Sequence, residues 1–488
     1  MPATIIATAQ PQQYNLVVGS NVWTLGSITS NEDAYVLQLV KYNEATGNST
    51  VIATIQQPPN PAGVAHFDVG KILQSYMDIA FVEETQQATT TLGQTLTYRA
   101  RWGSVTDNIY TYNAESTLKH VFNGYVDWRE LNWERWNKYV ANPVASLCEG
   151  PSGYIDGDYP QRTEFMTNFP DAIPVRSSTY HTLSFVNRIG NYANGTNWGN
   201  SEQPYGVRIK WYDPSDNLIQ TVIYAISGTT GLGPRTGFNQ LPGGGFAYYD
   251  QQWVGTIGAG PQNLKDAGYW VQSNPAVWNL VSQVWGNYDV VWNLATTEAI
   301  VGYYTVEVCS VNMCYWDANG SPQTPTTASL IPYMGDVIYT KTFTVADPCT
   351  AYDPITVSFV NQYGVKDYYT FDRRNTYNQR IGRNDYDQVL GSWSAATYEI
   401  DPHGRGRRTF STQIETQMTM SSYWMSDEES AWLEELFTSP HIQVYYNGVW
   451  EPAVITSNTY EQKTASRNGL FQHTLTVQFA NNKKVQRG

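Results

Sequence analysis

The residues of this sequence that could do chemistry are carboxylates, histidines and a few cysteines. Asp156-Gly157-Asp158 and the pair Asp385 and Asp387 place acidic groups close enough together to ligate calcium. An EF-hand loop, however, needs acidic groups at fixed offsets and a closing glutamate, and neither segment has them. We therefore interpret both as solvated turns and expect no metal site.

The histidines and cysteines predict no catalytic or metal centre either. No pair of the six histidines has the His-x-x-x-His spacing of a helical zinc site. Cys309 and Cys314 are separated by four residues and lack the Cys-x-x-Cys pairs or spaced histidines of structural zinc. The Gly-x-Ser-x-Gly turn of serine hydrolases is missing as well. We expect no catalytic residue, no cofactor and no metal, and hence not an enzyme.

The composition is that of a folded, acidic protein. Of 488 residues, 14% are aromatic and only 15% are charged, whereas disordered chains are charge-rich and aromatic-poor. Tyrosine and tryptophan are enriched at protein interfaces, although β-rich cores also use them. The formal charge of −14 makes general nucleic-acid binding a poor prospect, because that binding depends on basic groups that neutralise phosphates.

Neither membrane insertion nor signal-peptide export is expected. No apolar run approaches the roughly 20 residues that a membrane-spanning helix needs. The start, Met1-Pro2-Ala3-Thr4, lacks the basic residues and apolar stretch of a signal peptide. We therefore expect the chain to be made and folded in a cytoplasm.

The N-terminal quarter has the pattern of a β-sandwich. Short apolar or alternating runs at 13–18, 34–42, 50–55 and 95–102 are separated by turns. Asp68 is placed to cap a brief helix over 69–77, whose Ile72, Leu73 and Tyr76 would face the sheets.

The middle of the chain contains a helix signal and then more strands. Asp127 and Glu130 have capping-box spacing, which predicts a helix within a linker. Trp133 lies off the apolar stripe of that helix, so it is either an incidental residue of a linker packed on the first domain or a contact for a neighbouring subunit. Strands are expected at 207–211, 221–226, 303–309 and 338–345.

Residues 227–268 are rich in glycine and have no clear periodicity. A stretch of about 40 residues without periodicity is too long for an ordinary loop. We expect an extended assembly arm, with a long structural loop as the alternative. Its candidate anchors are aromatic: Phe246, Tyr248, Tyr249 and Trp253.

The C-terminal quarter carries the clearest local signals. Ser426 and Glu429 form a capping box that opens a helix over 427–437. Asn447-Gly448 predicts a two-residue hairpin turn, and 410–420 and 471–479 alternate as strands. A basic cluster precedes the strand at 410–420. It is either a polar hairpin tip or a patch that docks on an acidic neighbour. Its members are Arg405, Arg407 and Arg408.

The fold expected from these patterns is mainly β and multi-domain, with β-sandwich (Ig-like) domains followed by a C-terminal β-rich unit with one packed helix. The expected domains are 1–115 (sandwich), 116–142 (helical linker), 143–349 (second β domain with the arm 227–268) and 350–488 (C-terminal unit with helix 427–437).

The C-terminal quarter also resembles a known family. The segments in question are Ser358-Phe359-Val360-Asn361-Gln362-Tyr363-Gly364, Asp367-Tyr368-Tyr369-Thr370-Phe371 and Trp432-Leu433-Glu434-Glu435-Leu436-Phe437-Thr438-Ser439-Pro440. They resemble the C-terminal part of virion structural proteins from tailed phages of Bacteroidetes hosts, crAss-like phages among them. Gln362 stands where those proteins usually have arginine.

The resemblance implies a structural, non-enzymatic subunit of a phage tail, collar or baseplate, located in the virion and assembled in the bacterial cytoplasm. Its partners would be other virion proteins and copies of itself in a homo-oligomeric ring. One alternative is a receptor-binding tail protein whose aromatic residues stack on host-surface glycan. A less favoured alternative is a virion glycan hydrolase.

Overall fold

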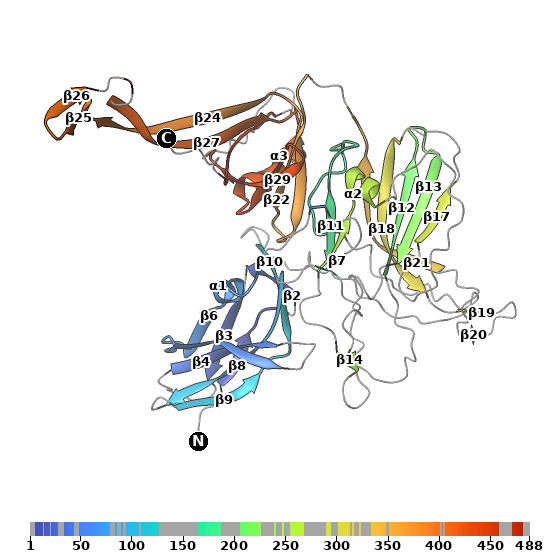
Figure 1. Ribbon diagram of the computed structural model, residues 1–488. Helices are drawn as coiled ribbons and strands as arrows, with labels where there is room; N and C mark the ends of the chain where they lie inside the picture. The colour runs from blue at the N-terminus through green and yellow to red at the C-terminus, as the bar shows by residue number, and fades with distance from the viewer. Residues whose placement is uncertain are drawn as a thin grey trace. The chain divides into compact units, whose positions relative to one another are not determined.

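The computed structural model of the chain forms two compact units. The first comprises residues 1–347 and 361–367, and the second comprises 348–360 and 368–488. The structure describes residues 5–12, 14–19, 21–27, 34–42, 48–78, 83–84, 89–90, 94–106, 109–125, 164–186, 205–225, 239–240, 246–247, 254–267, 289–293, 301–312, 315–316, 322–323, 333–347, 351–400, 403, 406–457 and 471–481. Over these residues the chain is mainly β, with several sheets and three helices, which confirms the predicted fold class (Figure 1).

The first unit begins with a β-sandwich. One sheet has the order β1 (Ile5–Ala9), β3 (Val22–Ser27) and β6 (Val64–Asp68). The other has the order β2 (Tyr14–Val18), β10 (Lys119–Tyr125), β8 (Thr95–Thr106), β4 (Ala34–Tyr42) and β5 (Ser49–Gln57), with β9 (Ile109–Glu115) also on β8.

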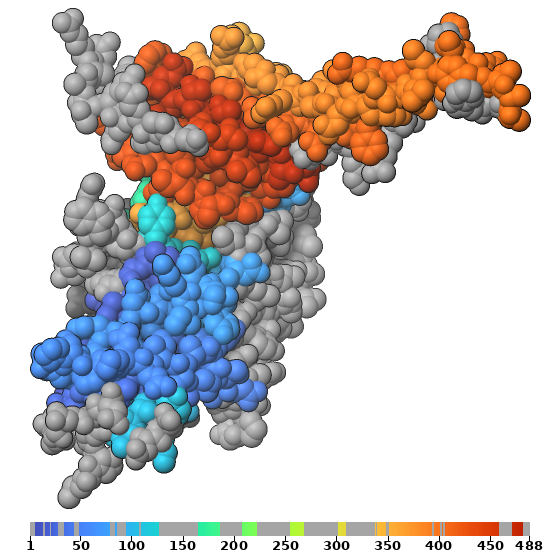
Figure 2. All heavy atoms as spheres, turned by 90° about the vertical axis from the view of Figure 1, so that its left-hand side faces the viewer, coloured from blue at the N-terminus to red at the C-terminus, as the bar shows by residue number. Residues whose placement is uncertain are grey.

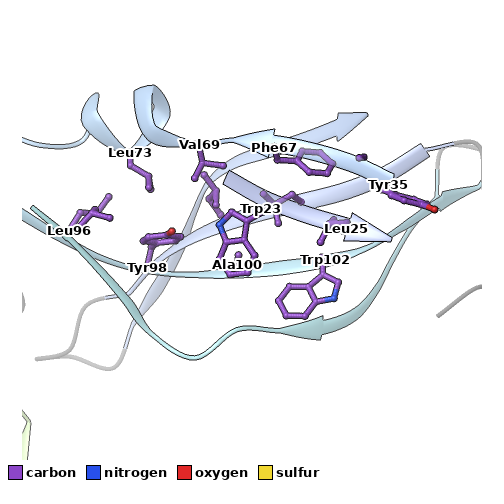
Figure 3. Packing of buried hydrophobic residues seen from close by; sticks show 14 of the residues in the cluster. Trp23, Leu25, Tyr35, Phe67, Val69, Leu73, Leu96, Tyr98, Ala100 and Trp102 are labelled. Atoms are coloured by element: carbon purple, nitrogen blue, oxygen red, sulfur yellow. The ribbon is translucent and has the colours of Figure 1, made fainter. Parts of the chain in front are cut away.

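Aromatic side chains from both sheets fill the core of this sandwich. Trp23 of β3 and Trp102 of β8 lie with their ring centroids 5.8 Å apart, and Phe67 and Tyr98 pack beside them (Figure 3). Successive residues of a strand point to opposite faces, so the alternation around Trp23 and Leu25 directs one face of β3 inward. Both tryptophans are buried.

The short helix α1 (Gly70–Gln74) covers one end of the sandwich core. Asp68 Oδ1 accepts a hydrogen bond from the Gly70 amide at 3.1 Å, close to the predicted capping role. Leu73 is buried as expected, but Tyr76 is exposed because the helix ends before it; its hydroxyl donates to the Ile52 carbonyl instead.

The rest of the first unit consists of two further sheets and short ladders. The smaller of the two sheets has the order β11 (Thr182–Val186), β16 (Val254–Gly258), β7 (Thr89–Thr90). The larger sheet has the order β17 (Asp289–Asn293), β13 (Leu218–Ala225), β12 (Tyr205–Tyr212), β18 (Tyr303–Asn312), β21 (Tyr333–Thr344). The ladders are β14 (Asn239–Gln240) with β15 (Phe246–Ala247), and β19 (Tyr315–Trp316) with β20 (Pro322–Gln323). Phe185 and Tyr339, with ring centroids 5.1 Å apart, join the two larger sheets.

Residues 254–267 differ from the assembly arm expected over 227–268. β16 is buried along its whole length and pairs with β11, and α2 (Pro261–Asp266) follows it directly. The amide oxygen of Asn263 accepts hydrogen bonds from the backbone amides of His181 and Gly260. This part of the glycine-rich stretch therefore belongs to the core of the first unit, because Val254, Ile257 and Leu264 supply apolar contacts between the glycines.

The second unit is one seven-stranded sheet, one helix and a long hairpin. The sheet order is β23 (Lys366–Phe371), β22 (Ile355–Val360), β28 (Ile442–Tyr446), β29 (Val449–Ile455), β30 (Thr474–Phe479), β27 (Gly406–Ser421), β24 (Asn375–Gln388). The short strands β25 (Gly391–Ser394) and β26 (Thr397–Ile400) pair at the far end of the hairpin.

The helix α3 (Asp427–Thr438) confirms the local signals of the sequence. Ser426 and Glu429 form the predicted capping box, with the Glu429 carboxylate accepting the Ser426 amide at 2.7 Å. The Trp432 ring packs 5.6 Å from Phe359 of β22. The Asn447-Gly448 turn between β28 and β29 has positive φ at both residues, as a type I′ turn requires.

Candidate functional site

Three of the described histidines are buried side chains. Burial lowers the pKa values of His120 and His181 to about 3, so both rings are neutral near pH 7 and closed off from solvent. His473 is also buried and hydrogen-bonds to Ser430 at 2.8 Å, as expected for a core histidine. Within the described ranges, no group of three potential metal ligands occurs and no helix is long and apolar enough to cross a bilayer.

Most of the predicted interface residues lie outside the described residues. These residues are Trp133, Tyr248, Tyr249, Trp253 and Arg405. The helix expected at Asp127 and the acidic turn at 156–158 also lie outside the described residues. Phe246 is in β15, whose backbone pairs with Gln240 of β14. Arg407 and Arg408 are exposed at the start of β27.

The most distinctive surface of the second unit is the hairpin β24–β27 with its tip β25–β26. We call this hairpin (residues 375–421) the arm; it is a different segment from the assembly arm predicted over 227–268. Its two long strands pair from Asn375 opposite Met420 to Gln388 opposite Gly406, with one register shift beside Asp385. Fourteen residues of extended strand span about 46 Å. The arm, orange in Figures 1 and 2, leaves the sheet and continues outward as a ribbon.

The base of the arm is anchored in the core of the second unit. Met418 and Met420 of β27 are buried, and β27 pairs with β30 from Gln417 to Ser421. Tyr377 of β24 stacks on Tyr446 of β28, with ring centroids 5.8 Å apart. Between the pairing with β30 and the tip strands β25–β26, the described part of the arm consists of β24 and β27 alone.

The arm displays large apolar side chains to solvent from its base to its tip. Their exposed fractions run from 39% for Tyr377 to 69% for Val389. The set comprises Tyr377, Ile381, Tyr386, Val389, Leu390, Tyr398, Ile400 and Phe410. A concentration of exposed apolar side chains on one element marks an interaction site more often than scattered single ones do.

One arginine of the predicted basic cluster pairs with an aspartate of β24. Arg407 Nε lies 3.3 Å from Asp385 Oδ2, and the Thr409 hydroxyl donates to Asp385 Oδ1 at 2.8 Å. Arg408 stands opposite Tyr386 in the ladder. The structure thus brings together Asp385 and Arg407, which the sequence assigned to two separate features.

The motif that carries the family resemblance has a packing role in the first unit. The Asn361 amide oxygen accepts from the amides of Tyr363 and Val365, while its nitrogen donates to the Met166 carbonyl at 2.9 Å. Gly364 has φ +77°, and a side chain there would collide with the Asn123 backbone.

Two further contacts hold this segment in place. The Gln362 carbonyl accepts the Tyr125 amide at 2.7 Å, so the position where arginine is usual makes this contact through its backbone. Lys366 forms an ion pair with Glu83, and both side chains are buried. Burial lowers the pKa of Lys366 to about 7.

No protein-family model and no curated protein matches the sequence. Function is therefore inferred from the arm and from the motif residues themselves.

Proposed function

We propose that the chain is a non-enzymatic structural subunit of a tailed-phage virion, a tail, collar or baseplate component that forms a ring with copies of itself and with other virion proteins. The arm carries this proposal, because it places exposed apolar side chains on an element that extends from its own sheet. The virion setting comes from the resemblance of the segments at 358–364, 367–371 and 432–440.

The energetics of the arm favour burial against another chain. A two-stranded ribbon without a packed face is marginally stable in water. Each square ångström of apolar surface removed from water contributes about 25 cal/mol. Burying Ile381, Leu390 and Ile400 on a neighbour would therefore stabilise both the contact and the ribbon that carries it. Such an element suits a protein whose working state is an assembly.

The chemistry of the exposed side chains favours a protein partner over a glycan. Carbohydrate recognition uses aromatic faces together with fixed polar groups, whereas Val389, Leu390 and Ile400 at the tip are aliphatic. The buried core of a contact between protein chains is largely apolar, which suits these side chains. Receptor or glycan binding remains the second candidate, carried by the exposed rings of Tyr386, Tyr398 and Phe410.

Two of the buried histidines are unsuited to serve as a general base. A general base must reach the proton that it removes and titrate near the working pH. His120 and His181 meet neither condition. A virion-associated hydrolase would have to draw its acid and base from elsewhere in the chain.

Shortening the arm is expected to block assembly without unfolding the protein. Asn378 and Gln417 are paired directly, so residues 379–416 can be replaced by an Asn-Gly turn. Tagged full-length and shortened chains would be produced in the host during infection and their incorporation into purified particles compared. We expect incorporation to fall at least about tenfold, which is about 1.4 kcal/mol of association free energy.

A pair of point variants separates the loss of apolar contact from the loss of the hairpin. Leu390→Ser with Ile400→Ser removes two exposed aliphatic side chains from the tip, and Val51→Ser with Val454→Ser removes two from elsewhere. The tip variant should reduce incorporation and the control should not. Normal incorporation of the shortened chain would remove the basis of the proposal.

A further inference from the structure

The outer edge of β24 is a long, exposed strand edge. β24 is the last strand in the order of its sheet, so in the described part of the chain β27 is its one neighbouring strand. The side chains from 377 to 387 are all exposed, whereas those of β27 from 411 to 416, apart from Gln413, are partly or fully covered. A strand edge of this kind is a template for pairing with another strand.

The charges along β24 are divided by sign. Arg380 and Arg383 precede Asn384, and Asp385 and Asp387 follow it. An identical strand that pairs with β24 in the parallel direction would place like charges side by side. An identical strand in the antiparallel direction can place Arg383 beside Asp385. The strand is therefore electrostatically complementary to a reversed copy of itself.

The net charge of the arm also suits contact between copies. The whole chain carries a formal charge of −14, so two copies repel each other over most of their surfaces. The arm has five basic and five acidic residues and is neutral. They are Arg380, Arg383, Arg405, Arg407 and Arg408, and Asp385, Asp387, Glu399, Asp401 and Glu415.

From this pattern we infer that the outer edge of β24 pairs with β24 of a second copy, antiparallel, about a two-fold axis at Asn384. In this register Arg383 of each copy lies across from Asp385 of the other. Directly opposite residues in an antiparallel pair have Cβ atoms about 4.5–5.5 Å apart, within reach of an ion pair. The inference rests on the proposed function and names a copy of the chain as the partner of this edge.

The same register pairs a glycine with an aromatic ring. Gly382 has open space around its Cα, because a Cβ added there would meet no atom within 4 Å. Tyr386 of the second copy would lie across from it, and an aromatic side chain opposite a strand glycine covers the backbone that the glycine leaves exposed. Two-fold symmetry makes each of these contacts twice.

Charge reversal on the full-length chain tests the pairing. Sedimentation equilibrium at low salt is expected to show a dimer for the native sequence. Arg383→Glu sets like charges together at two places and should weaken association about tenfold, and Asp385→Arg should do the same. The double variant R383E/D385R restores opposite charges and should recover association. Lys71→Glu, the same charge change on α1 of the first unit, should have no effect.

A cysteine placed at the two-fold axis gives a second readout. Asn384→Cys brings the two introduced thiols face to face, so mild oxidation should yield a covalent dimer through residue 384. Gln379→Cys on the same strand separates the thiols by about ten residues, or roughly 34 Å, and should not cross-link. Mass spectrometry of the linked peptide distinguishes this bond from one made by the four native cysteines.

Two outcomes overturn the inference: a native chain that stays monomeric at the highest soluble concentration, or a dimer that neither charge reversal weakens. If the shortened arm still blocks incorporation into particles in that case, the edge binds a different virion protein and the proposed function stands. If the shortened arm has no effect on incorporation, the proposed function itself fails, whatever the charge variants show.

Discussion

Replacing Trp432 with alanine is expected to lower the free energy of unfolding of the second unit by about 3–5 kcal/mol. The indole is 4% exposed and contacts Phe359 at 5.6 Å and Tyr369 at 6.0 Å between ring centroids. Its removal leaves a cavity between α3 and the sheet, because the neighbouring rings are fixed by strands β22 and β23 and cannot collapse into the space.

The matched control for this substitution is Trp424→Ala. Trp424 is 57% exposed, so its removal should change stability by no more than about 0.5 kcal/mol. Hydrogen exchange of the α3 amides in the full-length chain reports the unfolding free energy of this unit separately from that of the first unit. Equal protection of α3 in the Trp432 variant and the native chain would show that the helix does not depend on this contact.

Acidification is expected to destabilise the first unit through its two buried histidines. Burial lowers the pKa values of His120 and His181 from 6.5 to about 3, with Lys119 and Lys341 respectively adding to the effect. The unfolded chain therefore takes up protons below pH 6.5 that the folded chain does not. The stabilisation is complete above pH 6.5 and is lost progressively as the pH falls from 6.5 toward 3.

The expected loss of unfolding free energy follows from how far the pH falls below 6.5, the pKa of histidine in the unfolded chain. From pH 6.5 to pH 5 each histidine contributes about 2 kcal/mol, so the pair contributes about 4 kcal/mol. Urea unfolding at a series of pH values, monitored in the first unit, measures the slope. H120Q/H181Q should flatten this slope, and His66→Gln, at an exposed position of β6, should leave it unchanged. A slope that persists in the double variant would mean that other groups cause the loss.

Elements defined by local chemistry could be predicted from the sequence. The capping box at Ser426, the turn at Asn447-Gly448 and the strand over 34–42 depend on neighbouring residues, so their types and spacing were sufficient. The end of α1 before Tyr76 was harder to predict, because apolar residues continue the helical spacing beyond Gln74.

Features that depend on distant residues could not be predicted. β24 contains few apolar residues, so its sequence lacks the apolar–polar alternation that predicts a strand. It is a strand because it pairs with β27. The buried strand β16 was hidden among glycines because its partner β11 lies some 70 residues earlier. The partner of Asn361, the Met166 carbonyl, is 195 residues away, so the role of the motif asparagine was visible only as a resemblance.

The candidate site was anticipated only in part. Arg407 and Arg408 do lie on the exposed hairpin, but the sequence pointed to a basic patch, and Arg407 instead pairs with Asp385. The exposed apolar residues of the arm gave no signal, because a strand pattern does not reveal whether its apolar face meets a core. Tyr386 and Phe410 became neighbours only through the pairing of two segments about 25 residues apart.

A cryo-EM map of the assembled particle would show whether the arm is an assembly element. We expect density for the arm, from Asn375 to Ser421, to pack against a neighbouring chain, with Leu390 and Ile400 buried there. An arm that projects into solvent in every copy of the subunit, with these side chains exposed, would contradict this expectation.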